Sequence, residues 1–351
     1  MSRLGNQLIT RQPFSSPVDV VRHFGALQAQ DYLGSLWALG LRTAKSSEAR
    51  IEAVLAEGSV LRTHIFRGTW QYVTPADVRW MLSLVAERVI ASTASRHREL
   101  GLDAKTLGRS VELIAEALSG EQHLTRRELS VVLSRRRIDT SDARLLHILG
   151  HAELRGVICS GARRGKQATF ALLAERAPKA PTLTREQALE KLARRYFGSR
   201  GPATERDFGW WTGLPLREVR QAIELARTRL ARTIIDGREH WSAGEANGGR
   251  ARRGIHLLPA FDECLIAYRD RGAFVEAEHV RKINAGGGIL KPALLCNGRV
   301  VGTWQRALEK RRVSIEVRPF RTLTANERVL LNAAAERYAA FLGLSARTVV
   351  R

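Results

Sequence analysis

The 351-residue sequence contains few cysteines, few prolines and no long hydrophobic run. Its three cysteines, Cys159, Cys264 and Cys296, are odd in number and widely spaced, which excludes a disulfide framework and a zinc knuckle. We interpret them as small core or surface residues. The nine histidines show no metal-ligand spacing, so neither a metal site nor a cofactor is predicted.

No apolar stretch reaches the ~18 residues that a transmembrane helix needs, and the N-terminus lacks the apolar segment of a signal peptide. We therefore expect a cytoplasmic, nucleoid-associated protein that does not contact membranes. With 44% hydrophobic residues and only 10 prolines, the chain should fold throughout. Its length exceeds what one hydrophobic core usually organises, so we expect several cores or a row of small units.

Acidic residues are also scarce relative to basic ones. There are 57 Lys and Arg against 35 Asp and Glu, which gives a net charge of +22. Such an excess predicts a polyanionic partner. Most of the basic residues are arginines, whose planar guanidinium suits phosphate contacts better than the ammonium of lysine. Nucleic acid is therefore favoured over a membrane surface.

Residues 106–178 show three segments with helical spacing of apolar residues, followed by two short alternating segments. The second helix should begin after Thr125, where Glu128 completes a capping box. The alternating segments predict a β-hairpin with a basic turn at residues 161–166. Three helices followed by a basic hairpin make a winged helix, whose third helix usually enters the major groove of DNA.

The same order of elements is predicted twice more, at residues 182–244 and, less regularly, at residues 1–105. In the first unit we expect helices near 17–30, 33–41 and 47–57, then a strand pair on either side of Arg67-Gly68.

Later in the chain, period-two runs and an Asn297-Gly298 turn predict a β-rich domain at residues 254–322. A capped helix within 323–351 follows. The predicted fold class is α+β, mainly α, with tandem winged-helix units and a small β-rich C-terminal domain.

Arginines and one lysine cluster around the predicted third helices and hairpin turns, where phosphate contacts are expected. A solvated basic surface is the alternative, and the density of the charges argues against it. The predicted DNA-binding residues are Arg126, Arg127, Arg135, Arg136, Arg137, Arg163, Arg164, Lys166, Arg217, Arg220 and Arg227.

Two polar features interrupt otherwise apolar segments. Gln28 and Gln30 flank one alanine at the end of the predicted first helix, where they would face one cleft only if the helix ends between them. On the residues alone, a polar helix end is the simpler interpretation. Asp262 and Glu263 form a paired-carboxylate candidate, which we interpret as a structural ion pair with neighbours such as Arg269 or Arg271.

These features occur together with several short motifs in a characteristic order. The motifs are Leu27-Gln28-Ala29-Gln30-Asp31, Arg67-Gly68-Thr69, Leu258-Pro259-Ala260-Phe261-Asp262-Glu263, Tyr268-Arg269-Asp270-Arg271, Lys291-Pro292-Ala293 and Gly298-Arg299-Val300-Val301-Gly302-Thr303-Trp304. Over nearly its whole length the chain resembles the AlkZ/YcaQ family of bacterial winged-helix DNA glycosylases.

The resemblance implies hydrolytic excision of alkylated purines from double-stranded DNA, in some members from interstrand crosslinks. A Gln-apolar-Gln signature marks the AlkZ-like branch, whereas the YcaQ-like branch has Asp in place of the second Gln. Gln28 and Gln30 match the first branch, which makes them the candidate catalytic residues. Trp70 stands where the resemblance implies a smaller apolar residue.

Two other functions remain open on the sequence. A winged-helix fold also suits a non-enzymatic DNA-binding regulator, because a fold does not determine a function. Regulators usually dimerise, and no coiled-coil heptad is present, so we expect a monomer. A relative that recognises lesions without excising them is the third possibility. Formation of abasic sites in alkylated DNA separates the glycosylase from both.

Overall fold

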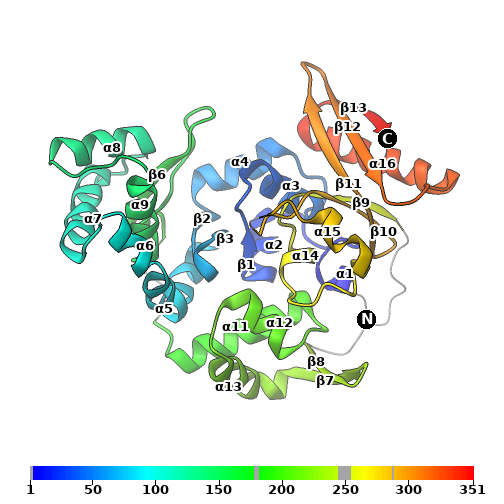
Figure 1. Cartoon of the computed structure of the whole chain (residues 1–351), viewed down its shortest axis with the longest axis horizontal. Coiled ribbons are helices and arrows are strands. Elements are labelled where there is room, and N and C mark those ends of the chain that lie inside the picture. The colour runs from blue at the N-terminus through cyan, green and yellow to red at the C-terminus, as the bar shows by residue number, and fades with distance from the viewer. Residues whose placement is uncertain (1–2, 178–181, 244–253, 287) are drawn as a thin grey trace.

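The computed structural model describes residues 3–177, 182–243, 254–286 and 288–351 (Figure 1). Helices and strands are mixed along the chain, which confirms the mixed fold class. The sequence predicts linkers at Pro178–Pro181 and at Gly244–Gly254, and of these residues only Gly254 is among those described. None of the helices within these ranges combines the length and apolar character needed to cross a bilayer.

The first part of the chain contains six α-helices and a small sheet. Its elements are α1 (Arg3–Asn6), α2 (Pro17–Phe24), β1 (Ala26–Gln28), α3 (Tyr32–Arg42), α4 (Glu48–Glu57), β2 (Leu61–His64), the 3-10 turn η1 (Phe66–Gly68), β3 (Trp70–Val73), α5 (Pro75–Ser92) and α6 (Ala94–Glu99). The helices predicted at 33–41 and 47–57 and the strand pair are confirmed.

The helix predicted at 17–30 is too long. It ends at Phe24 because Gly25 adopts a left-handed φ of 77°, and the chain then enters β1. Gln28 therefore lies on a strand and not on a helix. The three residues of β1 are all buried, so their sequence shows none of the polar alternation that predicts a strand.

Strand β1 belongs to a three-stranded antiparallel sheet with the order β1-β3-β2. In register, Gln28 lies opposite Gln71 of β3, and Gln71 lies opposite Thr63 of β2. Side chains that are directly opposite one another share a face of the sheet. The sheet therefore sets three polar side chains in one row.

The second part has the predicted helices and hairpin. Its elements are α7 (Ala104–Leu118), β4 (Leu124–Thr125), α8 (Arg126–Arg135), α9 (Arg144–Leu154), β5 (Ile158–Ser160), β6 (Thr169–Leu172) and α10 (Leu173–Arg176). The predicted capping box of Thr125 and Glu128 is present at α8. Strand β4, which the sequence analysis missed, joins the hairpin in a sheet of order β4-β6-β5. Apolar residues between Leu102 and Ile158 form a core cluster of their own.

The third part again has three helices followed by a hairpin. Its elements are α11 (Arg185–Arg200), α12 (Glu205–Thr212), α13 (Leu216–Ala226), η2 (Arg227–Arg229), β7 (Leu230–Ile235) and β8 (Arg238–Ala243). Its apolar side chains belong to a large core cluster that also includes residues of the first part and of the C-terminal part.

The C-terminal part forms a five-stranded sheet with one long helix. Its elements are β9 (Ile255–Leu258), α14 (Glu263–Ile266), η3 (Ala277–His279), α15 (Val280–Ile283), β10 (Ala293–Cys296), β11 (Arg299–Leu308), β12 (Arg312–Pro319), α16 (Ala325–Leu342) and β13 (Ser345–Val350). The predicted turn at Asn297-Gly298 has positive φ at both residues. Strand β13 was not predicted. It pairs in parallel with β12, so the end of the chain belongs to this sheet.

Candidate active site

Gln28 and Gln30 lie at and just past the end of strand β1, where both side chains reach the start of β3. The Ala29 N–H donates to the carbonyl of Trp70 at 2.8 Å, so pairing with β3 continues to Ala29. Gln30 follows in a bend. Because the helix ends at Phe24, the objection that residues two apart on a regular helix face different sides does not apply.

Both amide oxygens are held by the start of β3. The hydroxyl of Thr69 donates to Oε1 of Gln28, and the backbone N–H of Trp70 donates to Oε1 of Gln30, each at 3.2 Å. Gln28 is 6% exposed, whereas Gln30 is half-buried. Across the described part of the chain, no hydrogen-bond acceptor lies within reach of either amide nitrogen. The NH₂ groups of both glutamines are thus left to donate hydrogen bonds to another molecule.

A row of buried polar groups continues from Gln28 across the sheet. Gln71 and Thr63 are almost fully buried, and both the Gln71 Oε1 and the Thr63 Oγ1 have no hydrogen-bond partner among the described residues. Buried polar groups are seldom left unpaired. Sequence reasoning missed this row. The signal was the polar pair Thr69 and Gln71, two positions apart on the segment that forms β3, with Thr63 on the strand predicted to pair with it.

A buried ion pair fixes the backbone of the site. Oε1 of Glu263 accepts the N–H of Gln28 at 2.9 Å, and its Oε2 lies 2.9 Å from Nη2 of Arg200. Arg200 also donates to the carbonyls of Phe24 and Ala26. The ion pair therefore links α14 to both ends of β1, to Gln28 through Glu263 and to Ala26 through Arg200.

The neighbouring carboxylate forms a second buried pair. Asp262 accepts two hydrogen bonds from Arg42, each at 2.8 Å. The prediction that Asp262 and Glu263 serve as structural ion-pair partners is confirmed, but the predicted partners Arg269 and Arg271 are wrong. Arg271 donates to the Leu265 carbonyl instead.

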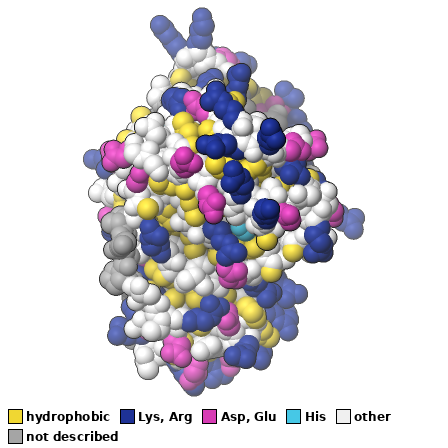
Figure 2. Space-filling view, turned by 90° about the vertical axis from the view of Figure 1, so that its left-hand side faces the viewer, with side chains coloured by type: hydrophobic (Ala, Val, Ile, Leu, Met, Phe, Trp, Pro, Cys, Tyr) yellow, Lys and Arg dark blue, Asp and Glu magenta, His cyan; other side chains and the backbone are white. Residues whose placement is uncertain are grey.

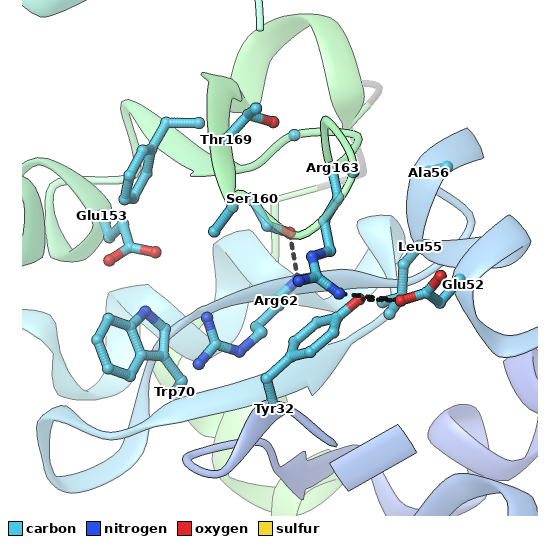
Figure 3. A pocket seen from close by; sticks show the side chains of 14 residues that line it. Tyr32, Glu52, Leu55, Ala56, Arg62, Trp70, Glu153, Ser160, Arg163 and Thr169 are labelled. Atoms are coloured by element: carbon cyan, nitrogen blue, oxygen red, sulfur yellow. Dashed lines mark hydrogen bonds and ion pairs between the residues drawn. The ribbon is translucent and has the colours of Figure 1, made fainter. Parts of the chain in front are cut away.

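A cavity of about 280 Å³ lies beside the glutamines, between the first part and the β5–β6 hairpin (Figure 3). Three aromatic rings and four charged side chains line it together with small residues. These aromatic and charged lining residues are Tyr32, Glu52, Arg62, Trp70, Glu153, Arg163 and Phe170.

The cavity and the glutamines share a wall. Nε of Arg62 donates to the carbonyl of Ala29, between the two glutamines, at 3.0 Å. The backbone N–H of Trp70 donates to Gln30, and the indole of Trp70 lines the cavity. Burial, followed by the charge of Glu52, raises the pKa of Tyr32, so its hydroxyl stays protonated. Burial lowers the pKa of Arg62 from its usual value.

The predicted DNA-binding residues are almost all on the surface. Side chains of Lys and Arg are spread over the side of the molecule formed by the second part (Figure 2). The exposed members of the predicted set are Arg126, Arg127, Arg135, Arg136, Arg137, Arg164, Lys166, Arg217, Arg220 and Arg227. Three of them are paired with acids: Arg164 with Glu128, Arg220 with Glu205 and Arg227 with Glu224.

Arg163 is placed differently from the rest of this set. Its side chain is 24% exposed and pairs with Glu52 at 3.0 Å. Its guanidinium lies over the ring of Tyr32, 4.3 Å from the ring centroid. It therefore forms part of the cavity wall.

Elsewhere among the described residues, one group of side chains has metal-ligand spacing. The ligand atoms of Glu276, Glu278 and His279 lie within 4.8 Å of one another, and both carboxylates are exposed. The sequence analysis did not identify this group.

Comparisons with known proteins identify the family of the chain. The family model described as DNA glycosylase AlkZ-like matches residues 21–341. An interstrand DNA cross-link repair glycosylase of Streptomyces sahachiroi is 27% identical over 318 residues, which are 86% of this chain and 85% of that protein. The solved structure of Streptomyces sahachiroi DNA glycosylase AlkZ superimposes with a TM-score of 0.80 at 25% identity, covering 99% of this chain and 97% of the other.

Proposed function

Because the chain belongs to the AlkZ-like family of DNA glycosylases, hydrolases that act on N-glycosyl bonds in DNA repair, we propose that its substrate is a cationic alkylated purine in double-stranded DNA. Interstrand crosslinks and bulky adducts through a purine nitrogen fall in the same chemical class. Gln28 and Gln30 act at the scissile sugar.

The chemistry of the lesion suits two neutral amides. A purine alkylated at N7 or N3 carries a positive charge and leaves as a neutral base without a general acid. What remains is to position a water molecule and to stabilise an oxocarbenium-like sugar. An amide can hold the water by donating or accepting a hydrogen bond, and its partially negative oxygen can stabilise the cation, although it cannot act as a general base at neutral pH.

The observation that carries the proposal is that both amides are anchored to two adjacent residues at the start of β3. Their oxygens accept from the Thr69 hydroxyl and from the Trp70 N–H, so the groups are preorganised before DNA binds. On a continuous helix, residues two apart would lie about 200° apart and would not share this anchor.

The surrounding architecture supports binding to a duplex. We infer that residues 104–176 form a winged helix, because three helices are followed by a hairpin whose sheet includes β4. The parts at 3–99 and 185–243 repeat the order of helices and hairpin. The exposed arginines of α8 and its C-terminal end would contact phosphates. We further propose that the protein acts as a monomer in the cytoplasm.

Single-turnover excision of N7-methylguanine from a duplex tests the assignment. Gln28→Ala and Gln30→Ala should each lower the rate by about 100- to 1,000-fold, the usual effect of losing one preorganised polar contact, with DNA affinity nearly unchanged. Gln122→Ala is the matched control, because Gln122 is exposed and bonds only the Gly120 carbonyl among the described residues.

The outcome also distinguishes the alternatives. Wild-type rates in both folded alanine variants would remove Gln28 and Gln30 from the mechanism. No excision by the wild type on any alkylated duplex would favour a DNA-binding regulator. We expect no adduct trapped by borohydride, because no lysine is among the described residues that line the cavity.

A further inference from the structure

We propose that Arg67 and Arg271 bind a phosphate of the alkylated nucleotide and so set its sugar against Gln28 and Gln30. Neither residue is among the arginines predicted to bind DNA. This inference rests on the proposed function and extends it by naming the substrate group that is held beside the amides. The two arginines belong to separate motifs of the chain, Arg67-Gly68-Thr69 and Tyr268-Arg269-Asp270-Arg271.

Arg67 lies in η1, the turn that leads into the residues anchoring both amides. Two residues later the hydroxyl of Thr69 donates to Gln28, and the N–H of Trp70 donates to Gln30, each at 3.2 Å. Arg67 has a left-handed φ of 56°, which is uncommon for a residue other than glycine and recurs at ligand sites. A group bound by Arg67 is therefore placed relative to the amides by only three residues of backbone.

The side chain of Arg67 is packed against the third part of the chain. Its guanidinium lies over the ring of Trp210 of α12, 5.1 Å from the ring centroid, as in a cation–π contact. A Cβ atom on Gly213 would lie 3.1 Å from Cγ of Arg67, so the missing side chain at Gly213 leaves room for the arginine stem. These contacts hold a half-buried guanidinium in one place.

Arg271 and Trp210 are attached to the same end of α14. Nε of Arg271 donates to the carbonyl of Leu265 at 2.7 Å, and Nε1 of Trp210 donates to the carbonyl of Ile266 at 3.1 Å. The first residue of α14 accepts the backbone N–H of Gln28. This short helix therefore joins the second arginine to the strand that carries the first amide.

Neither guanidinium has a carboxylate partner within the described parts of the chain. Nε of Arg67 is buried there without any hydrogen-bond partner. Burial lowers the pKa of Arg67, and the charge of Glu263 opposes this shift while that of Arg271 adds to it. Burial also lowers the pKa of Arg271. Both groups stay protonated at neutral pH, so two like charges act on each other without a counter-ion.

The carboxylates around these arginines are already paired elsewhere. Glu263 pairs with Arg200 at 2.9 Å, and Asp270 pairs with Arg238 at 3.3 Å. An anion for Arg67 and Arg271 must therefore come from another molecule. A phosphate suits them, because a planar guanidinium can donate two parallel hydrogen bonds to its oxygens. The DNA backbone supplies such a group at every nucleotide.

The phosphate concerned is one of the two on the sugar that is cleaved. That sugar lies at Gln28 and Gln30 in the proposed function, and its 5′ and 3′ oxygens each carry a phosphate. Arg67 is connected to the amides through η1, and Arg271 is connected to them through α14. Holding one of these phosphates therefore fixes the sugar relative to the amides, which is the positioning that this mechanism needs.

Binding to a stable duplex with tetrahydrofuran in place of the damaged nucleotide tests the contact without requiring catalysis. A neutral methylphosphonate replaces the phosphate on the 5′ side of the tetrahydrofuran in one duplex and on the 3′ side in another. One of these replacements should weaken wild-type binding about 10- to 100-fold, the usual effect of losing hydrogen bonds to a charged group. A methylphosphonate near the end of the duplex should change binding less than twofold.

Arginine variants identify the residues that contact the phosphate. Arg67→Gln and Arg271→Gln should each bind the unmodified duplex more weakly, and the flanking methylphosphonate should weaken them little further. A variant that only disturbed η1 would stay as sensitive to the methylphosphonate as the wild type. Arg269→Gln is the matched control, because Arg269 is exposed and lies two positions before Arg271. It should keep the full sensitivity.

The outcomes separate this inference from the proposed function. Wild-type binding that is the same for all the duplexes would overturn the phosphate contact, and so would variants that lose as much affinity to the flanking methylphosphonate as the wild type does. Excision of N7-methylguanine by the wild type would leave the glycosylase proposal standing in either case. A loss that depends on Arg67 and Arg271, in a protein that excises no alkylated purine, would support the contact and overturn the proposed function.

Discussion

The carboxylate of Glu263 holds the backbone of the candidate active site, and replacing it should unfold part of that site. Glu263 and Arg200 are both almost completely buried, with side-chain exposures of 1% and 0%. One oxygen accepts from Gln28 and the other from Arg200. Both carboxylate oxygens of Glu263 therefore accept hydrogen bonds from buried donors.

The substitution Glu263→Gln removes the charge and converts one acceptor into a donor. Its NH₂ group must then face either the N–H of Gln28 or the guanidinium of Arg200, and both are donors. Arg200 keeps its bonds to the carbonyls of Phe24 and Ala26, but its charge loses its buried counter-ion. Breaking a buried pair in this way typically costs about 3–5 kcal/mol in the free energy of unfolding.

This loss should be visible in thermal unfolding. At about 2.1 cal/mol/K per residue, the unfolding entropy of 351 residues is roughly 0.74 kcal/mol/K. The melting temperature should therefore fall by about 4–7 °C. Excision of N7-methylguanine, measured below the transition, should also slow, because the Gln28 backbone loses its acceptor.

The control is a surface pair of the same residue types. Glu224 pairs with Arg227 at 3.2 Å, and both side chains are more than half exposed. Glu224→Gln should leave the melting temperature nearly unchanged, because exposed pairs contribute little. If Glu263→Gln melts within about 1 °C of the wild type, the pair does not stabilise β1 and the reasoning fails.

Three further predictions follow from charge and burial. Affinity for undamaged duplex should fall with salt at a slope near −5 in log–log form if about six phosphates are neutralised, and Arg126→Ala with Arg127→Ala should reduce that slope by about two; a flat salt titration would contradict this. Burial lowers the pKa of His151 to about 4, and the unfolded chain titrates near 6.5. The unfolded state then binds the proton first, so stability should decrease from pH 7 to pH 5 in urea titrations, and less so in His151→Phe. Gln71→Leu removes the unpartnered Oε1 opposite Gln28, so it should raise the melting temperature while slowing excision at least tenfold; unchanged excision would exclude a role for Gln71.

Local signals in the sequence predicted the elements that depend on neighbouring residues. The capping box of Thr125 and Glu128, the helix capped by Thr324 and the Asn297-Gly298 turn each involve residues at most three positions apart. The hydrogen bonds that define them form within one turn. Such features are encoded locally, and they appear in the structure where the pattern places them.

Strand β1 shows where local patterns fail. Residues 26–28 continue the apolar pattern of α2, and tertiary burial of all three residues erases the alternation of a strand. Gly25 was the available signal, because a left-handed glycine commonly ends a helix. Strand β13 was missed for a related reason. Its pairing partner β12 lies on the other side of a helix of 18 residues.

The partners of the buried charges depend on contacts between distant parts of the chain. Arg42 and Asp262 are 220 positions apart, and Gln28 and Glu263 are 235 apart. Charge and motif predicted that Asp262 and Glu263 would be ion-paired. They could not indicate which arginines the fold brings to them, and nearby Arg269 and Arg271 were the natural choice.

The candidate site therefore requires nearly the whole chain. Gln28 and Gln30 come from β1, the acceptor that holds β1 comes from α14, and the far wall of the cavity comes from the β5–β6 hairpin. Arg163 and Ser160 join that hairpin to the first part. A site assembled in this way is rigid only in the complete fold. Two neutral amides depend on that rigidity for any catalytic effect. In the mechanism that we propose, no charged group takes part, so Gln28 and Gln30 can accelerate hydrolysis only by being fixed in place before the substrate arrives.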